Sequence, residues 1–432
     1  MKYALINPPW SFTGSIYFGC QQQHLPLEFG YSRQVLEAAG HAVRLIDAQL
    51  EELSNAEVGQ QLAEFAPDVT VVTTAPSYLF WRCAPPELRV PLETVRSIRP
   101  WVGALIMVGP HASTTPKATL RKLGADAVVL GECEEILPLF AEFERGRWDR
   151  IPSICYEEDG DIRMQSGGPH ASDMKALPPL VWERQLVAKH RHHHHRFDAE
   201  PAAPGAEMEV SRGCPYHCTF CAKDNFRDDY RKRHPVTILE ELDGLLELGV
   251  EYIYFIDEIF LPDPHLLCAF AERSFKFGVQ TRVDLWKPSM LELLGQAGCV
   301  SLEAGVESIS AQGRDRLAKN CKMSLDELTD RLICAKRGVP FVQANLLESQ
   351  DDDPSAVESW RRELQKHGIW ANKPVPLFPY PGSPEYTRKW NLPDDLAWER
   401  AVDYYLEEYS EFSDIQDSKP RRVQQLEAID GR

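Results

Sequence analysis

The stretch SRGCPYHCTFCAKDNFR, residues 211–227, contains three cysteines in the spacing Cys214-x3-Cys218-x2-Cys221. It directly follows an apolar run typical of a strand, and its glycine and proline favour a loop. Three thiolates on such a loop can bind one face of a cuboidal iron–sulfur cluster, which leaves the fourth iron open to a substrate. The spacing therefore predicts a [4Fe–4S] site at Cys214, Cys218 and Cys221.

Zinc is the alternative metal for three neighbouring cysteines. Structural zinc sites usually take four ligands in paired spacing, and the sequence supplies neither a second CxxC pair nor a nearby histidine pair. The cluster is therefore favoured over zinc. The remaining eight cysteines are scattered singly, which is typical of small buried hydrophobic residues.

Downstream of this loop, short apolar runs alternate with helical patterns. The predicted strands are AEMEVS from residue 206, and those at 252–257, 279–284, 300–305, 339–347 and 374–379, with helices at 235–248, 264–276 and 290–297 between them. Six βα units predict a partial (β/α)6 TIM-type barrel, with chemistry at the carboxyl ends of its strands.

Upstream, the first 150 residues show the same alternation. Predicted strands begin at residues 2, 41, 68, 103 and 126, and predicted helices cover 28–39, 56–65, 88–98, 117–123 and 134–143. This order predicts parallel βαβ units in a doubly wound, Rossmann-like sheet. Ligands bind beyond the carboxyl ends of such strands, here in the loops NPPW (7–10), TTAPS (73–77), GPHAS (109–113) and GECEE (131–135).

The sequence predicts four regions. They are a Rossmann-like domain at 1–150, a polar linker at 151–204, the partial barrel at 205–385 and a small helical C-terminal extension at 386–432. The linker contains four consecutive histidines, His192–His195. A solvated loop is the expected structure for this run, and metal binding is the alternative.

Composition restricts the class of function. A formal net charge of −18 argues against a broad nucleic-acid or anionic-membrane surface, so a small-molecule substrate is expected. The N-terminus MKYALINPPW lacks a signal-peptide layout, and no apolar run is long enough to span a bilayer. We therefore expect a cytoplasmic protein whose eleven cysteines are reduced thiols plus one metal site.

The cysteine spacing, with Phe220 before the last cysteine, resembles the hallmark of the radical SAM superfamily. The resemblance extends to PYPGSPEY (379–386). It implies that the open iron binds the amino and carboxylate groups of S-adenosylmethionine (SAM). One electron from the reduced cluster, supplied by an external donor such as flavodoxin or ferredoxin, then breaks a carbon–sulfur bond and usually gives a 5′-deoxyadenosyl radical.

Three further motifs, FIDEIF (255–260), TRVDLW (281–286) and LEAGVES (302–308), resemble the strand-end motifs that contact SAM in this superfamily. The resemblance implies SAM contacts for Phe220, Asp257, Glu258, Arg282, Asp284, Glu303 and Gly305. The carboxylates can accept hydrogen bonds from the amino group or the ribose, and a guanidinium matches the SAM carboxylate. A solvated strand-end pair is the alternative for Asp257 and Glu258. The stretch RDRLAKN (314–320) likewise resembles the family, with helix capping as the alternative for its Lys319.

The upstream region resembles the cobalamin-binding domain of cobalamin-dependent radical SAM enzymes, in INPPW, in residues 25–47, in VGPHAS and in LGECEE. The resemblance implies cobalamin contacts for Pro8, Ser77, Gly109, His111, Ser113, Gly131 and Glu132. The D-x-H-x-x-G signature of a lower axial histidine is absent, so His111 and His24 are candidates by residue type alone. A domain that keeps the fold without the cofactor is an open alternative.

The combined resemblance implies a methyltransferase that acts on an unactivated carbon of a small-molecule or natural-product intermediate, through a 5′-deoxyadenosyl radical and methylcobalamin. The alternative is another radical reaction, such as rearrangement, cyclisation or 3-amino-3-carboxypropyl transfer, with cobalamin optional. Methylthiotransfer expects three further cysteines in the N-terminal domain that bind a second cluster, and usually a small basic C-terminal module. Here Cys20, Cys83, Cys133 and Cys155 lie in varied contexts, and the tail is acidic through Phe412. A cobalamin or metal sensor is the non-enzymatic alternative.

Overall fold

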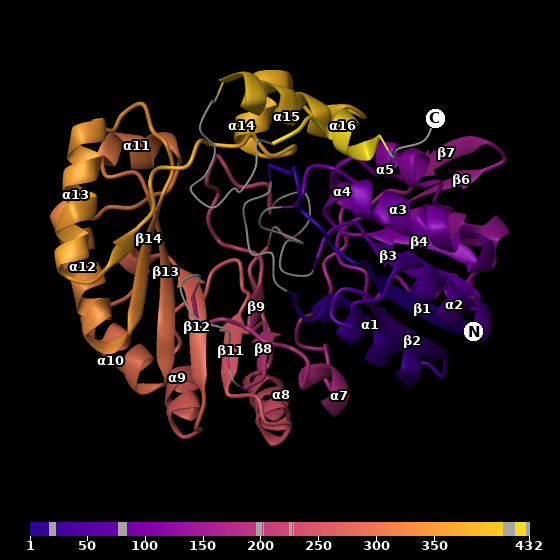
Figure 1. Cartoon of the computed structure of the whole chain (residues 1–432), viewed down its shortest axis with the longest axis horizontal. Helices are drawn as coiled ribbons and strands as arrows, with labels where there is room; N and C mark the ends of the chain where they lie inside the picture. Colours follow the sequence, from indigo (N-terminus) through magenta and orange to yellow (C-terminus); the bar gives the residue numbers. More distant parts are fainter. Residues whose placement is uncertain are drawn as a thin grey trace.

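The computed structural model describes residues 1–16, 23–76, 84–195, 201, 203–223, 227, 229–408 and 420–428. Two α/β halves lie side by side, and the C-terminal helices cross one end of the molecule over both halves (Figure 1). Among the described residues, no helix is long and apolar enough to span a bilayer.

The first half contains a seven-stranded sheet in the order β2-β1-β3-β4-β5-β6-β7. Its strands are β1 (Lys2–Asn7), β2 (Ala42–Asp47), β3 (Val69–Thr73), β4 (Ala104–Val108), β5 (Ala127–Val129), β6 (Ile154–Glu158) and β7 (Asp161–Met164). The first five are parallel, which confirms the predicted doubly wound sheet. Strands β6 and β7 add antiparallel pairs, so the sheet extends beyond residue 150 into the segment that was predicted as a linker.

Helices connect these strands close to the predicted positions. They are α1 (Leu27–Ala38), α2 (Asn55–Phe65), α3 (Arg89–Ile98), α4 (Pro110–Thr114), α5 (Pro116–Leu123) and α6 (Leu139–Glu142). Ser54 and Glu57 form a reciprocal capping box that fixes the start of α2. The helix predicted at 134–143 is wrong over its first half: α6 begins only after Pro138, a residue that favours helix starts.

The second half contains six parallel strands in the order β15-β14-β13-β12-β11-β8. They are β8 (Gly205–Met208), β11 (Tyr252–Phe255), β12 (Lys276–Thr281), β13 (Cys299–Glu307), β14 (Phe341–Leu346) and β15 (Trp370–Ala371). The intervening helices are α8 (Pro235–Glu247), α9 (Pro264–Ala271), α10 (Pro288–Gln296), α11 (Ala311–Arg316), α12 (Leu325–Gly338) and α13 (Pro354–Lys366). This arrangement, with the helices along one face of the sheet (Figure 1), confirms the predicted partial barrel.

The sixth strand is not where the sequence predicted it. The run at 374–379 forms only an isolated bridge, between Leu347 and Val375. Three prolines in this run lack the N–H group that a strand interior needs. The last strand is instead the short β15.

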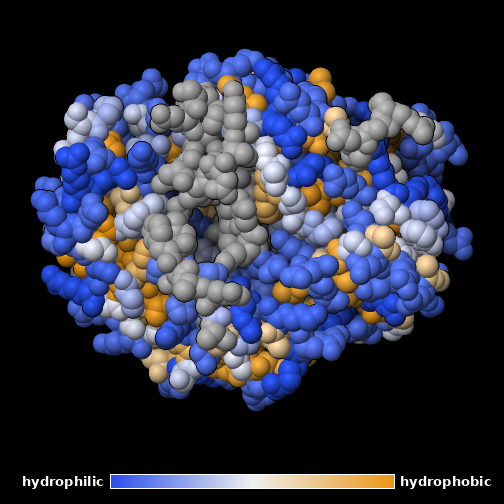
Figure 2. Space-filling view, viewed as in Figure 1, coloured by the Kyte–Doolittle hydropathy of each residue, from blue (hydrophilic) through white to orange (hydrophobic). Residues whose placement is uncertain are grey.

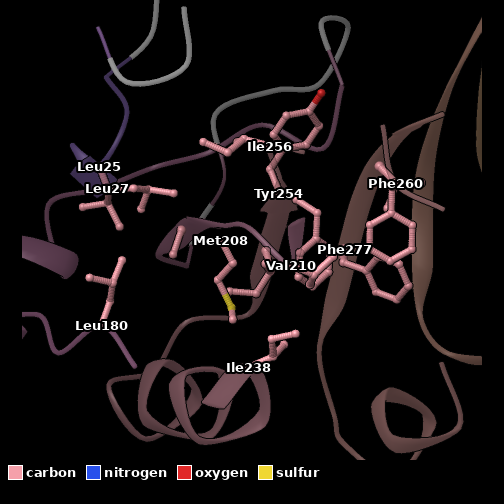
Figure 3. Close-up of a cluster of buried hydrophobic side chains, with 14 of the residues drawn as sticks. Leu25, Leu27, Leu180, Met208, Val210, Ile238, Tyr254, Ile256, Phe260 and Phe277 are labelled. Atoms are coloured by element: carbon pink, nitrogen blue, oxygen red, sulfur yellow. The ribbon is translucent and has the colours of Figure 1, made fainter. Parts of the chain in front are cut away.

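One hydrophobic core runs through both halves. Figure 3 shows Met208 of β8 beside Ile238 of α8, and Leu25, Leu27 and Leu180 nearby. All five are buried members of the same cluster, which also contains Tyr3 and Leu5 of β1. The two halves therefore pack as one unit.

The C-terminal helices α14 (Pro384–Trp390), α15 (Ala397–Glu408) and α16 (Val423–Glu427) pack against the first half. Lys122 Nζ lies 2.6 Å from a Glu399 carboxylate oxygen and 2.8 Å from one of Glu427. Trp398 Nε1 donates to Thr115 Oγ1 over 3.2 Å. These contacts connect the last helices to α5 and to the turn before it.

A buried carboxyl beneath these helices predicts a pH dependence of stability. Ser15 Oγ donates to Glu87 over 3.0 Å, and burial raises the pKa of Glu87 to about 7, from about 4.5 in an exposed glutamate. The folded chain therefore keeps a proton that the unfolded chain has released, so this group's contribution to the free energy of unfolding falls as pH rises between those values. Between these two pH values the free energy of unfolding of wild type is expected to decrease by up to about 3 kcal/mol because of this group, and Glu87→Gln is expected to lack that decrease.

Urea unfolding of wild type and Glu87→Gln at several pH values from about 5 to 8 measures the effect. The variant is expected to show a flatter dependence of the free energy of unfolding on pH. Parallel curves for the two proteins would contradict the prediction.

Candidate cluster and cofactor sites

The three cysteines lie on a loop whose ends are clamped together. Strand β9 (Ser211–Arg212) pairs antiparallel with β10 (Arg231–Lys232), which brings together the two segments that flank the cysteines. Gly213 opens the loop with φ +77, in the left-handed region that favours glycine. The sulfurs of Cys214, Cys218 and Cys221 are free thiols on half-buried residues.

The spacing of the three sulfurs fits a cluster better than a single zinc ion. The three do not all lie within 4.8 Å of one another, although the cysteines are near enough to interact electrostatically. Two sulfurs of a tetrahedral zinc site would be about 3.8 Å apart. Burial, together with the charges of Cys214 and Cys218, raises the pKa of Cys221 to about 12. A cationic cluster would relieve this by binding all three as thiolates.

Two carboxylates hold the backbone at the start of the cysteine loop. Asp257 accepts hydrogen bonds from Val210 N, over 3.2 Å, and from the Ser211 hydroxyl. Glu258 accepts from Gly213 N over 3.0 Å. Burial raises the pKa of Asp257 to about 7. These contacts position the loop, and binding of the SAM amino group by Asp257 and Glu258 remains a prediction.

The other side of the loop is connected to two distant segments. Thr219 N donates to Leu317 O over 3.0 Å, and Glu385 N donates to Thr219 O over 2.9 Å. Glu385 belongs to α14 and to the PYPGSPEY motif. This motif therefore braces the cysteine loop from the C-terminal side.

Arg282 follows β12 and lies against the same loop. Its guanidinium is 4.1 Å from the ring of Tyr216, and Nε and Nη2 donate to Asp284 over 3.2 and 2.8 Å. The third nitrogen, Nη1, is buried and has no hydrogen-bond partner among the described residues. A guanidinium nitrogen that can still donate a hydrogen bond fits the predicted role of Arg282 in binding the SAM carboxylate. Asp284, predicted to bind ribose, uses both carboxylate oxygens to orient Arg282.

Glu307, the last residue of β13, and Lys319, which follows α11, form an ion pair near Cys218. The sequence did not reveal this pair. Lys319 Nζ lies 2.7 Å from Glu307 Oε1, and both charges act on Cys218. A Cβ on Gly305 would lie 2.5 Å from the same oxygen, so a larger residue there would displace the pair. Glu307 has φ +66, and such strain in a non-glycine residue is typical of functional sites.

The remaining predicted SAM residues, Phe220 and Glu303, are half-buried, on the cysteine loop and on β13 respectively. Their SAM contacts remain a prediction. Glu307 lies within LEAGVES, where Glu303 and Gly305 are the predicted SAM contacts, and its ion pair with Lys319 is the feature that distinguishes it in the structure.

In the first half, a hydrogen bond joins the segments that follow β4 and β5. Gly109, with φ +115, begins α4, and Ser113 Oγ donates to its carbonyl over 3.0 Å. The same hydroxyl accepts from Gly131 N over 2.8 Å. A Cβ on Gly131 would lie 2.3 Å from His170 O. These three residues, predicted as cobalamin contacts, shape the loop edge through these bonds.

A buried polar side chain without a hydrogen-bond partner among the described residues lies at this edge of the first sheet. The Thr74 hydroxyl, after β3, is buried and has no hydrogen-bond partner among the described residues. Such a hydroxyl fits a ligand with amide groups like those of cobalamin. Pro8 is buried after β1, and Ser77 lies outside the described residues. In the space-filling view, hydrophilic residues cover most of this face of the molecule, with hydrophobic residues scattered among them (Figure 2).

Glu132, a predicted cobalamin contact, lies among three arginines. Its carboxylate is buried and lies 3.2 Å from Arg212, 3.1 Å from Arg227 and 2.7 Å from Arg231. Ser172 N also donates to it over 2.7 Å. Burial alone would raise the pKa of Glu132, but the three guanidinium groups hold it well below its usual range. These donors fix the carboxylate in place, and its cobalamin contact remains a prediction.

His111 is packed within the protein. Its ring stacks on Trp398 with centroids 4.2 Å apart, Nε2 lies 3.3 Å from Pro86 O, and burial lowers its pKa to about 3. Because the ring is 1% exposed, it has no face open to a corrin. His111→Ala is therefore expected to leave the visible and EPR spectra of bound cob(II)alamin unchanged. Nitrogen superhyperfine splitting in wild type that disappears in His111→Ala would contradict this prediction.

Two family models match the chain, one in each half. The B12 binding domain matches residues 20–141 and the radical SAM superfamily matches residues 208–341. An uncharacterized methyltransferase of Pyrococcus horikoshii is 24% identical over 93% of this chain and 86% of its own. The anaerobic magnesium-protoporphyrin IX monomethyl ester cyclase of Cereibacter sphaeroides is 23% identical over 88% of this chain, which spans 63% of that relative.

A solved structure agrees with the fold. The radical SAM methyltransferase TsrM from Kitasatospora setae, with tryptophan and a SAM analogue bound, superposes with a TM-score of 0.71 at 15% identity. The match covers 90% of this chain and 76% of TsrM. With both domain models present in this order, the chain belongs to the cobalamin-dependent radical SAM enzymes, whose cofactors are a [4Fe–4S] cluster, SAM and cobalamin.

Proposed function

We propose that the protein transfers a methyl group to an unactivated carbon of a small-molecule or natural-product intermediate. The observation that carries this proposal is the contact between Glu132, at the carboxyl edge of the first sheet, and Arg212, two residues before Cys214. This buried contact joins the predicted cobalamin edge to the predicted cluster loop. A methyl carrier and a radical source at one interface suit carbon methylation.

When bound, the cluster and SAM supply the means to remove a hydrogen atom, and cobalamin supplies the methyl carrier. An unactivated carbon has no lone pair with which to attack a methyl donor, so radical chemistry is needed there and would be superfluous at a nitrogen or oxygen. The chain's own residues position these groups. Cys214, Cys218 and Cys221 hold the cluster, Asp257 and Glu258 hold their loop, and Arg282 orients the SAM carboxylate.

A small substrate is consistent with the net charge of −18, which disfavours nucleic acid as a partner. Radical SAM enzymes need a reductant, and a flavodoxin or ferredoxin in the cytoplasm is the proposed donor. A reducing compartment also suits the free thiols of the chain.

The second candidate function is rearrangement or cyclisation, which the cyclase of Cereibacter sphaeroides favours. Transfer of the 3-amino-3-carboxypropyl group of SAM belongs to the same alternative. These reactions would use the same residues around the cluster but would leave the SAM methyl group out of the product.

SAM labelled separately in its methyl and aminocarboxypropyl groups distinguishes these functions. The anaerobically reconstituted protein, loaded with cobalamin and reduced, is incubated with each labelled SAM and a small-molecule extract. Methyl label is expected in the extracted cobalamin and in a product, together with 5′-deoxyadenosine. Aminocarboxypropyl label, or an unlabelled isomerised product, would contradict methyl transfer.

A further inference from the structure

The histidine run of the linker is not the solvated loop that the sequence predicted. His190 and His192 are buried, at 0% and 8% exposed. The next rings pack against the barrel: His194 stacks on Tyr252 at 4.4 Å and His195 on Phe341 at 4.1 Å. Tyr252 and Phe341 are the first residues of β11 and β14, so the run lies against the amino ends of the barrel strands.

Three segments bring their side chains together beside this run. His24 precedes α1, His192 belongs to the linker, and Glu207 lies on β8. His24 Nδ1 is 2.7 Å from Glu207 Oε1, and His192 Nε2 is 3.4 Å from the same oxygen. One ligand atom from each of the three residues lies within 4.8 Å of the others, and all three residues are buried.

The tautomer of His192 indicates a cation in this cluster. His192 Nδ1 lies 2.8 Å from His193 O, an acceptor, so Nδ1 carries the proton. Nε2 of a neutral ring is then an unprotonated lone pair. It is buried without a hydrogen-bond partner among the described residues and faces a carboxylate oxygen, which is another acceptor. Two acceptors facing each other in a buried space are stabilised by a cation between them.

The other carboxylate oxygen of Glu207 is held by donors from outside the cluster. Leu25 N donates to Oε2 over 3.0 Å, and His190 Nε2 lies 3.2 Å from it. His190 is itself fixed, because its Nδ1 lies 2.8 Å from Gly205 O. Outer hydrogen bonds of this kind orient the ligands of metal sites. Here they fix Glu207 with Oε1 toward the two histidines.

We propose that His24, His192 and Glu207 bind one divalent first-row transition-metal ion, in a site separate from the iron–sulfur cluster. Two imidazoles and one carboxylate are a ligand set that zinc and ferrous iron accept. Neighbouring ligand atoms in a tetrahedral site with 2.0 Å bonds are about 3.3 Å apart. The distances of 2.7 and 3.4 Å around Glu207 Oε1 lie close to that value. The ion would tie together the entrance to α1, the linker and β8.

Zinc is the probe for the test. The holoenzyme, with its cluster and cobalamin in place, is treated with chelator and incubated with excess Zn²⁺. After desalting, metals are counted by plasma mass spectrometry. Wild type is expected to retain about one zinc ion per chain, in addition to the cluster iron. His192→Ala and Glu207→Gln are expected to bind zinc at least about tenfold more weakly.

His193→Ala is the matched control, since it lies next to His192 and is not one of the three ligands. Equal zinc loss in His193→Ala and His192→Ala would show that the histidine run binds metal as an unstructured tag does, and would overturn the site. Undiminished zinc binding in His192→Ala would overturn it as well. Iron content and cobalamin content of each variant report whether it is folded.

Wild type alone supplies a second test that does not depend on variants. X-ray absorption at the zinc edge is expected to show only nitrogen and oxygen ligands, at about 2.0–2.1 Å. A sulfur shell at about 2.3 Å would place the zinc on cysteines and overturn the proposal. Absence of bound zinc after incubation would do so too. Neither result bears on methyl transfer, so the two proposals can fail independently.

Discussion

Replacing Cys214 with alanine is expected to remove the iron–sulfur cluster and to abolish SAM cleavage. The loop offers three sulfurs to four irons, so the loss of one ligand leaves two irons without a protein ligand. Reconstituted Cys214→Ala is expected to contain little of the about four iron atoms per chain that wild type binds. Its 5′-deoxyadenosine formation with a strong reductant is expected to fall below detection. Cys218→Ala and Cys221→Ala are expected to behave in the same way.

Cys268→Ala is the control for this prediction. Cys268 is an exposed free thiol on α9, away from the cysteine loop in sequence. The variant is expected to keep the iron content and the SAM cleavage of wild type. A Cys214→Ala protein that kept the cluster absorption and cleaved SAM would show that the cluster is bound elsewhere.

The cysteine spacing could be predicted from sequence because all three ligands lie within eight residues, so the pattern is local. The two sheets could be predicted for a related reason. Runs of buried β-branched residues alternate with helices of 3.6-residue periodicity, and that order restricts the topology to parallel βαβ units. Local chemistry therefore explains most of the fold. The exceptions, residues 134–138 and 374–379, are places where proline decides the backbone.

The roles of individual polar residues were harder to predict because they depend on partners far along the chain. Asp257 accepts hydrogen bonds from Val210 N and from the Ser211 hydroxyl, which lie 47 and 46 positions before it. The same holds for Glu132, whose arginine partners are 80 to 99 positions away. The histidine run looked polar and exposed, yet aromatic side chains from β11 and β14 cover it. Sequence spacing carries no signal for such tertiary contacts.

Arg212→Met is expected to destabilise the folded protein by about 3–5 kcal/mol. Arg212 is fully buried, and its Nη2 lies 2.8 Å from Glu134 and 2.6 Å from Glu209. Its Nη1 lies 3.2 Å from Glu132. Methionine is unbranched and apolar like the arginine stem, but it is shorter and has no charge, so the variant leaves these buried carboxylates with fewer counter-charges. Removal of one partner from a buried ion network costs far more than the network contributes as a whole, because the remaining charges stay desolvated.

Arg316→Met is the matched control for Arg212→Met. Arg316 also makes two hydrogen bonds to one carboxylate, Asp351, at 2.6 and 2.9 Å, but its side chain is 53% exposed. Its loss is expected to change the free energy of unfolding far less than the loss of Arg212, because water replaces the ion pair. Urea unfolding followed by circular dichroism compares the two variants. Because Arg212 joins the carboxyl edge of the first sheet to the cysteine loop, its variant is also expected to lose cobalamin and cluster iron together. A cost below about 1 kcal/mol for Arg212→Met would contradict the assignment of this network as the junction between the two halves.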